Sequence, residues 1–293
     1  MIAGHKKQIN QQTIKNTIIF SGIGLHSGLK SNVTIVPSKP DTGIKFIRTD
    51  IKTKDNINVI EALWSNVSST NLSTCISNKH QISVSTIEHL MSALSGMHID
   101  NVTIYIDGPE IPIMDGSSKP FVELIENSGI KQQNVKRKII KVKKSIKVNK
   151  DDSYIILEPH YQFSVDFEIE FKSSLVNKQS CQLQLINGNY KSDISSARTF
   201  GFEKDVEELR RRGLALGGNL QNAVVVGEKR ILNEDGLRFK DEFVRHKILD
   251  SIGDLYLAGY PVQGYFYAKK SGHFLNNQLL KKLLSNQENF EII

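Results

Sequence analysis

The amino-acid sequence predicts an α+β protein made of two similar domains, each with a β-sheet and two helices. The main observation is that both halves of the chain show the same order of elements, namely several strands, a helix, a strand and a final helix. A length of 293 residues also suits two domains of ordinary size. No repeat of fixed period accompanies this order, so the similarity concerns architecture alone. We expect the domains to span residues 1–132 and 133–293.

The first domain is expected to begin with short antiparallel strands that alternate with turns. These β-rich runs are residues 18–20, 33–35, 43–46, 59–60 and 72–76. Ser85-Thr-Ile-Glu88 fits a capping box, which would start a helix that runs to Gly96. A strand over residues 102–106 and a second helix over residues 121–126, ended by Gly129, complete the domain.

The second domain is expected to repeat this plan around an insertion. Its predicted strands are residues 139–148, 154–157, 163–171, 181–185 and 262–267. One helix is predicted from Phe243 and a final one over residues 275–284. The insertion, around residues 202–226, contains a helical stretch over 203–212 and a mobile glycine-containing loop over 214–222. Additional loops of this kind often shape a substrate site.

Composition limits the classes of protein that the chain can be. Hydrophobic residues make up 39% and charged residues 24%, as in soluble globular proteins, and no apolar run approaches the ~20 residues that cross a bilayer. The N-terminus lacks the apolar stretch of a signal peptide, so we expect a cytoplasmic location. Cys75 and Cys181 are far apart and have no CxxC partner. A metal site would therefore use histidine and carboxylate ligands.

The net charge of +7 is concentrated in one segment. Residues 131–150 carry nine basic and no acidic residues, so subtracting nine from +7 leaves −2 for the remainder. Because Ile140, Val142, Ile146 and Val148 alternate with lysines there, an inter-domain linker running into a half-buried strand explains the segment better than a polyanion-binding patch. No aromatic residues are interleaved for base stacking, and we expect no nucleic-acid partner.

The helix predicted from Phe243 to Asp254 carries the first chemical signal. At about 100° per residue, its apolar residues share one sector, whereas His246, Asp250 and Asp254 lie on the other face at intervals of one turn. This is metal-ligand spacing, although an isolated pattern of this kind more often forms an ion pair on a solvated helix face. Gly253 between the polar residues is expected to leave open space over the site.

Three more residues complete a possible hydrolytic centre. Glu88 and His89 at a helix start, with His246 and Asp250, make a possible His₂Asp set and one spare carboxylate. Three protein ligands leave a fourth position for water, and Glu88 would be the base. His273, in the loop before the last helix, is a candidate proton donor. The alternatives are the capping box for Glu88, a packed side chain for His89 and a bystander role for His273.

Five motifs occur in the order and spacing of one known family. They are Thr86-Ile-Glu-His-Leu90, Ile111-Pro-Ile-Met-Asp-Gly116, Ala197-Arg-Thr-Phe-Gly201, Arg245-His-Lys-Ile-Leu-Asp250 and Lys270-Ser-Gly-His273. Together they resemble the zinc-dependent UDP-3-O-acyl-N-acetylglucosamine deacetylases, which perform the committed step of lipid A synthesis in Gram-negative bacteria. The resemblance extends from about Thr17 to Leu284 and implies two α+β domains that face each other across one Zn²⁺ ion, with the active site at their interface.

The resemblance also implies the role of individual residues. The implied zinc ligands are His89, His246 and Asp250; Glu88 is the implied general base, His273 the general acid, Asp254 its orienting partner and Thr199 the stabiliser of the oxyanion. Phe200, Lys247, Lys270 and Phe171 are the implied substrate-binding residues, and the insertion would line a passage for the acyl chain. The resemblance implies that the partner is a nucleotide-sugar lipid precursor. It also implies that the protein is a monomer and comes near a membrane at most transiently. Ser73 stands where some relatives carry a cysteine near the metal.

Two other functions are compatible with the residues. One is a non-enzymatic RNA-binding protein that uses residues 131–150, since similar small α+β domains occur in that role. The other is a zinc amidase that acts on a different acetylated sugar or amide. Salt-dependent RNA binding without zinc would favour the first, and activity that does not require a long acyl chain would favour the second.

Overall fold

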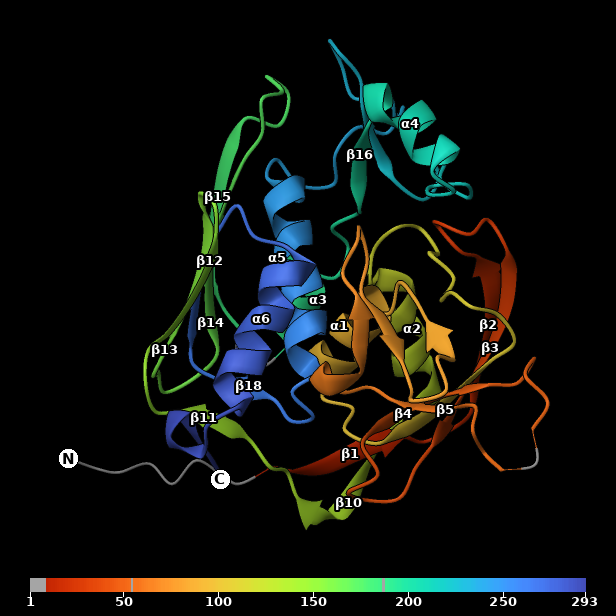
Figure 1. Cartoon of the computed structure of the whole chain (residues 1–293), viewed down its shortest axis with the longest axis vertical. Coiled ribbons are helices and arrows are strands. Elements are labelled where there is room, and N and C mark those ends of the chain that lie inside the picture. The colour runs from red at the N-terminus through yellow and green to blue at the C-terminus, as the bar shows by residue number, and fades with distance from the viewer. Residues whose placement is uncertain (1–8, 54, 186–187) are drawn as a thin grey trace.

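Two five-stranded sheets enclose a layer of helices in the computed structural model, which describes residues 9–293 except 54, 186 and 187 (Figure 1). The first sheet has the order β2 (Ile18–Ile23), β3 (Lys30–Pro37), β9 (Val102–Ile106), β4 (Ile44–Arg48) and β5 (Val59–Glu61). The second has the order β12 (Ile146–Lys150), β13 (Ser153–Glu158), β19 (Tyr265–Lys269), β14 (Ser164–Glu170) and β15 (Lys178–Gln184). The α+β class is therefore confirmed.

The two sheets share strand directions as well as strand order. In the first, β9 is antiparallel to β3 and parallel to β4, and in the second, β19 is antiparallel to β13 and parallel to β14. Side chains alternate between the helix layer and the outer face, as in β4, where Ile44 and Phe46 are buried and Lys45 is partly exposed. The repeated order predicted from the sequence is thus a repeated sheet topology.

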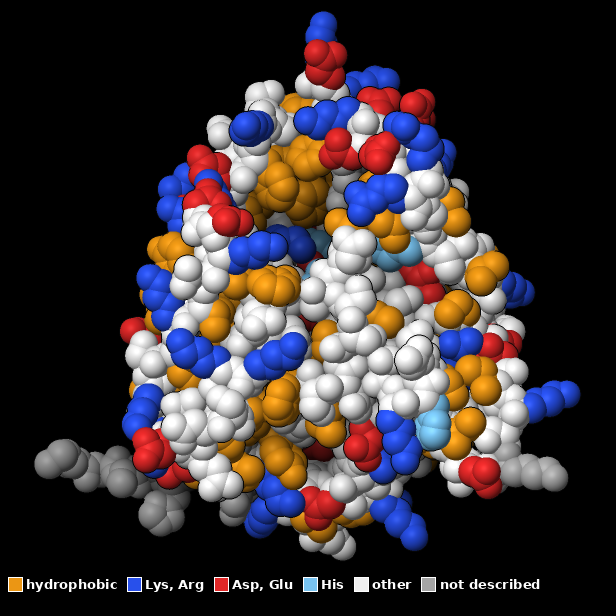
Figure 2. Space-filling view, viewed as in Figure 1, with side chains coloured by type: hydrophobic (Ala, Val, Ile, Leu, Met, Phe, Trp, Pro, Cys, Tyr) orange, Lys and Arg blue, Asp and Glu red, His pale blue; other side chains and the backbone are white. Residues whose placement is uncertain are grey.

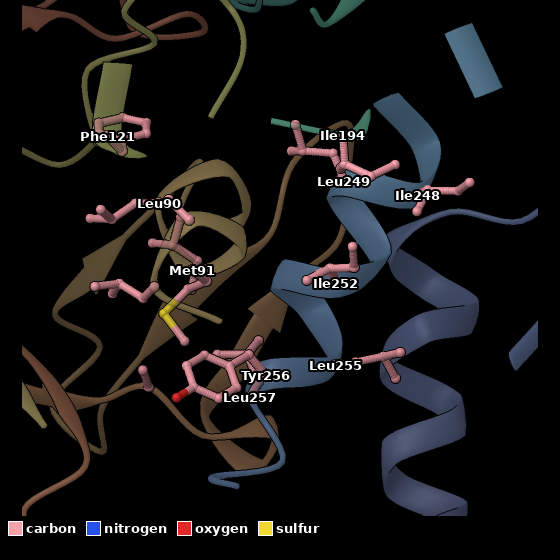
Figure 3. Packing of buried hydrophobic residues seen from close by; sticks show 14 of the residues in the cluster. Leu90, Met91, Phe121, Ile194, Ile248, Leu249, Ile252, Leu255, Tyr256 and Leu257 are labelled. Atoms are coloured by element: carbon pink, nitrogen blue, oxygen red, sulfur yellow. The ribbon is translucent and has the colours of Figure 1, made fainter. Parts of the chain in front are cut away.

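The four longest helices lie between the sheets (Figure 1). They are α1 (Glu88–Gly96), α2 (Lys119–Ser128), α5 (Glu242–Tyr256) and α6 (His273–Leu284). Helices α1 and α5, which precede the central strand of each sheet, pack directly against one another. Figure 3 shows that Met91 of α1 points toward the ring of Tyr256 on α5, within the main hydrophobic cluster. Burial of each such large apolar side chain stabilises the fold by about 1.5–3 kcal/mol.

The close approach of α1 and α5 depends on Gly253. A Cβ atom at this position would lie 2.0 Å from the carbonyl oxygen of Glu88 and 3.0 Å from the backbone nitrogen of Ser92. The expectation that Gly253 leaves open space over the site is therefore wrong. The backbone of α1 occupies that space, so glycine is required for helix contact.

We expect Gly253→Ala to separate these two helices. Because backbone atoms cannot move aside independently, the substitution should lower the free energy of unfolding by about 1–3 kcal/mol, as measured by urea denaturation. Gly201→Ala is the matched control, since a Cβ there meets nothing within 4 Å. Equal stability of the two variants would contradict the proposed reason for the glycine.

The basic segment 131–150 is more structured than expected. It contains strands rather than a linker and one strand: β10 (Ile130–Lys136), which pairs with β1 (Asn10–Ile14), then β11 (Ile140–Val142) and β12. Lys141 pairs with Glu291 and Lys144 with Glu288, each at 2.6 Å. These pairs with the end of the chain favour a solvated strand surface over a polyanion-binding patch. The expected domain boundary at residue 132 falls inside β10 and stays a prediction.

Shorter elements complete the described chain. They are β6 (Val67–Ser69), β7 (Cys75–Ser77), β8 (Ser83–Val84), β16 (Phe200–Phe202), β17 (Val224–Val226), β18 (Val262–Gln263), β20 (Phe290–Ile292), α3 (Asn189–Asp193), α4 (Val206–Arg211), η1 (Trp64–Asn66), η2 (Glu203–Asp205) and η3 (Gln287–Asn289). The parallel pair β16 and β17 frames the predicted insertion, which carries α4 at the top of Figure 1. In the part of the chain that the structure describes, no helix is long and apolar enough to cross a membrane.

Candidate metal centre and active site

The start of helix α1 is held by neighbouring segments and not by a capping box. The N-cap residue is Ile87 and makes no side-chain cap hydrogen bond, so the prediction from Ser85-Thr-Ile-Glu88 is wrong. Ser85 Oγ donates to the carbonyl of Pro109 instead. The Glu88 carboxylate turns away from the helix end and accepts a hydrogen bond of 3.0 Å from the backbone N–H of Thr74. This frees the buried Glu88 side chain for a role in the interior.

The polar face of helix α5 is buried, not solvated. His246, Asp250 and Asp254 are 2%, 2% and 3% exposed, because this face lies against α1 and α6 in the helix layer. The alternative of an ion pair on a solvated face is therefore excluded. Burying three titratable side chains on one helix face is unfavourable unless partners compensate their polar groups.

His89 of α1 meets two of these side chains. The Nε2 atoms of His89 and His246 lie 3.4 Å and 3.3 Å from Asp250 Oδ1, and one donor atom from each of the three residues lies within 4.8 Å of the others. The two imidazole rings are nearly perpendicular, with centroids 4.9 Å apart. Among the described residues, this is the one group of three histidine, cysteine or acidic side chains with such an arrangement.

The cluster fits a divalent metal ion. Asp250 Oδ1 is buried without a hydrogen-bond donor, and a cation held by this oxygen and the two Nε2 atoms would compensate it. His246 Nδ1 donates to the carbonyl of Ala197 at 3.1 Å, which leaves Nε2 as a lone-pair donor toward Asp250. Burial lowers the pKa of His246 to about 3, so the ring is neutral, as a metal ligand must be.

The charge of Asp250 is stabilised by its neighbours. Burial raises the pKa of its carboxyl group, but His246 and Lys247 outweigh this effect and lower the pKa well below its usual value. Lys247 Nζ lies 2.5 Å from Asp250 Oδ2. The structure therefore brings Lys247, expected from the sequence to bind substrate, into direct contact with a candidate metal ligand.

His273 lies on the other side of the cluster. It is the first residue of α6, so its expected position in a loop is wrong. Its Nδ1–H donates to Asp254 Oδ2 at 2.8 Å, and its Nε2 lies 3.9 Å from both Glu88 Oε1 and Asp250 Oδ2. Burial lowers the pKa of His273, but the carboxylates of Asp254, Asp250 and Glu88 outweigh this effect and raise the pKa to about 9. The imidazole is therefore protonated at neutral pH and faces Glu88.

The segment before β16 brings two further predicted residues to the site. Thr199 lies between Ala197, whose carbonyl contacts His246, and Phe200, whose ring centroid is 6.4 Å from that of His246. The backbone N–H of Thr199 donates to the carbonyl of Gly116 at 2.8 Å, which ties this segment to the first half of the chain. The structure thus places Phe200 beside His246, with Thr199 as its neighbour in the same segment.

An ion pair that the sequence analysis missed fixes this segment. Arg198 Nε donates to Glu242 Oε1 at 2.8 Å, and Glu242 Oε2 also accepts from the backbone N–H of Arg238. Glu242 is 0% exposed and opens helix α5, so the pair links the carbonyl that orients His246 to the helix that carries His246. The sequence signal for this ion pair was Arg198 in the motif Ala197-Arg-Thr-Phe-Gly201, because a charged residue beside Thr199 would require a partner of opposite charge.

Phe171 and Lys270, the two remaining predicted substrate-binding residues, contact side chains outside the metal cluster. The ring of Phe171 packs 5.6 Å from those of Phe200 and Phe202. Figure 2 shows hydrophobic side chains lining a hollow in this upper region, with histidine side chains visible beside it. Lys270 Nζ pairs with Asp152 at 2.8 Å and with Glu170 at 2.6 Å. Lys270 therefore has two carboxylate partners in the structure, and its role in substrate binding stays a prediction.

Glu110 is a further residue that the sequence analysis missed. Its carboxylate is 1% exposed and accepts from the backbone N–H groups of His26 and Ser27 and from Thr86 Oγ1, at 2.7–2.8 Å. Thr86 has a left-handed φ of 55° two residues before Glu88. Glu110 therefore stabilises the turn that leads into Glu88 and His89. Its only sequence signal was an acidic residue in an otherwise turn-rich loop.

The fold and these donor atoms define an α+β protein with a buried candidate metal site between two structurally similar halves. A family model for UDP-3-O-acyl N-acetylglycosamine deacetylase matches residues 11–285. The chain is 48% identical to the UDP-3-O-acyl-N-acetylglucosamine deacetylase of Histophilus somni, over 97% of this chain and 93% of the relative. It is 48% identical to the enzymes of the same name from Syntrophus aciditrophicus (96% and 88%) and Acidithiobacillus ferrooxidans (97% and 93%). The chain belongs to the UDP-3-O-acyl N-acetylglycosamine deacetylase family.

Proposed function

We propose that this protein is a zinc-dependent amidohydrolase that removes the N-acetyl group from UDP-3-O-(3-hydroxyacyl)-N-acetylglucosamine and releases acetate. The reaction would be the committed step of lipid A biosynthesis. The observation that carries the proposal is the convergence of His89, His246 and Asp250, with Glu88 Oε1 and His273 Nε2 next to this cluster and 3.9 Å apart. Family membership and the names of the relatives support the substrate.

His89, His246 and Asp250 would hold the Zn²⁺ ion. When bound, such an ion polarises an amide carbonyl and lowers the pKa of a coordinated water from about 15.7 towards 7. Two neutral imidazoles and one carboxylate leave a net positive charge at the ion, which suits this role.

Glu88 would act as the general base. Burial raises the pKa of its carboxyl group, although His273 and His89 oppose this, and a raised pKa makes the carboxylate a better proton acceptor. The hydrogen bond from the Thr74 N–H holds Oε2, so Oε1 faces the site. Glu88 would therefore take a proton from the attacking water.

His273 would act as the general acid. An amide nitrogen is a poor leaving group and must be protonated as the C–N bond breaks. Asp254 accepts the Nδ1–H of His273, so Nε2–H is the proton that points into the site. Asn276 Nδ2 donates to Asp254 Oδ2 at 2.8 Å and keeps this carboxylate in place.

Thr199 would stabilise the oxyanion of the tetrahedral intermediate through its hydroxyl group. Thr199→Val should lower kcat about a hundredfold, equivalent to about 3 kcal/mol, because one electrostatic donor is lost. KM and metal content should stay the same, and Thr199→Ser should retain most of the rate. A valine variant with unchanged kcat would remove Thr199 from the mechanism.

The upper part of the site would bind the substrate. Phe200 would contact the sugar, Phe171 the uracil, and Lys247 and Lys270 the charged portion, while the insertion around residues 202–226 would line the acyl passage. The hydrophobic hollow in Figure 2 supports an apolar passage. We further propose that residues 1–132 and 133–293 act as two domains and that the enzyme works as a cytoplasmic monomer.

The decisive experiment is a turnover assay with two substrates. The metal-loaded enzyme is incubated with UDP-3-O-(3-hydroxyacyl)-N-acetylglucosamine or with UDP-N-acetylglucosamine, and free acetate and amine are quantified. We expect stoichiometric acetate and amine from the acylated compound and far slower turnover of the other. Equal turnover of both would point to an amidase of broader specificity, and no acetate from either would refute the proposed function.

A further inference from the structure

Thr74 touches the candidate base and the partner of the candidate acid at the same time. It immediately precedes strand β7 and is 2% exposed. Its hydroxyl group lies 2.5 Å from Asp254 Oδ1 and 3.2 Å from His273 Nδ1. Its backbone N–H donates to Glu88 Oε2 at 3.0 Å. One residue of the first half of the chain therefore links groups carried by α1, α5 and α6.

The hydroxyl group completes the hydrogen bonding of Asp254. Oδ2 of this carboxylate accepts from His273 Nδ1 and Asn276 Nδ2, each at 2.8 Å, and Oδ1 accepts from Thr74 Oγ1. Without the hydroxyl, Oδ1 would be a buried carboxylate oxygen that loses this donor. The carboxylate could then rotate and carry the His273 ring with it.

The backbone of Thr74 is tied to α1 from both sides. Its N–H donates to the Glu88 side chain, and its carbonyl accepts from the N–H of Ile87 at 3.4 Å. The bond from the hydroxyl to Asp254 anchors this same residue on α5. The position of the N–H that orients Glu88 therefore depends on the hydroxyl that orients Asp254.

We propose that Thr74 is a positioning residue that holds Glu88 and the Asp254–His273 pair in register across the interface of α1, α5 and α6. The inference deepens the proposed function and rests on it. Thr74 needs no contact with the substrate or with a metal ion, because it acts through Glu88 and Asp254. It should therefore affect kcat and leave KM and metal content unchanged.

A matched control separates this role from ordinary burial of a threonine. Thr13 is also 2% exposed, and its hydroxyl donates to the carbonyl of Asn101 at 2.5 Å, within the β1 region of the fold. Thr74→Val and Thr13→Val each remove one buried hydroxyl with little change in volume. Both should lose stability, whereas only Thr74→Val should lose turnover.

The test compares Thr74→Val, Thr74→Ser and Thr13→Val in the metal-loaded full-length enzyme, with the acylated UDP-sugar as substrate. We expect Thr74→Val to lower kcat about 10- to 100-fold with KM and bound zinc unchanged, which is typical of losing an outer-shell partner. Thr74→Ser should restore the rate to within about threefold, and Thr13→Val should match the wild type. In an Asp254→Ala background, adding Thr74→Val should have less than about a threefold effect, because the carboxylate through which Thr74 acts is already absent.

Three results would overturn the inference. They are a Thr74→Val enzyme with wild-type kcat, a loss that is not recovered by serine, and an undiminished effect in the Asp254→Ala background. A wild type without turnover would instead refute the proposed function. In that case the ¹⁵N resonance of His273 Nδ1 decides: it should shift in Thr74→Val and not in Thr13→Val, and an unchanged resonance would refute the positioning role independently.

Discussion

Replacing His246 by alanine is expected to remove both bound zinc and turnover. The variant loses one of three donor atoms and leaves Asp250 Oδ1 without that imidazole neighbour at 3.3 Å. Wild-type protein should bind on the order of one zinc ion per chain, and the variant far less under the same dialysis conditions. Metal analysis by atomic emission and the acetate assay measure the two effects. Turnover should fall at least about 10⁴-fold, because the metal and its bound water act together.

A histidine outside the site provides the control for this experiment. His160 is half-buried, and its Nδ1 lies 2.9 Å from the carbonyl of Gln162 near the start of β14. His160→Ala should keep both zinc and activity. Full metal content with full activity in His246→Ala would refute the assignment of the metal site, and equal losses in both variants would indicate unfolding instead.

Removing the imidazole of His273 is expected to have the second-largest effect. His273→Gln should lower kcat about 10²- to 10⁴-fold, the range contributed by a general acid. It should also change the pH profile. A general acid is active in its protonated form, and the pKa of His273 is raised to about 9, so wild-type kcat/KM should be constant near neutral pH and fall as the pH rises through about 9. The variant should lack this alkaline limb.

The acidic limb of the same profile belongs to Glu88. A general base is active in its deprotonated form, and the pKa of Glu88 is raised, mainly by burial. The rate should therefore fall as the pH drops through this raised pKa, which gives a bell-shaped profile. Because Glu88 and His273 are close enough to interact, the two limbs report the pair and not isolated residues. A wild-type rate that is flat between pH 5 and 10 would contradict both roles.

Much of the fold followed from short-range patterns in the sequence. The helix that begins near Phe243, the strand over residues 102–106 and the repeated order of elements are all found in the structure. Periodicity predicts such elements because residues on one face recur at every second position along a strand and at every third or fourth position along a helix. The strands β1 and β10 were missed, because each depends on a partner more than a hundred residues away.

The chemistry of the site was only partly contained in such patterns. The spacing of His246 and Asp250 placed both on one helix face, and five motifs identified the family. The same local reasoning offered a capping box as an alternative role for Glu88 and expected open space at Gly253. Both assignments were wrong because the deciding neighbours, Thr74 for the carboxylate and the backbone of α1 for the glycine, come from other parts of the chain.

The sequence by itself thus determined most of the main elements, the family and the residue types that can hold a metal or move a proton. The tertiary structure alone decided that His89 meets His246 and Asp250, that the polar face of α5 is buried, and that Thr74 lies between Glu88 and Asp254. The physical reason is the separation along the sequence of the residues that interact. Helix and strand periodicity arises between residues a few positions apart, whereas a catalytic site is formed by the packing of α1 against α5, whose residues are distant in sequence and share no local pattern.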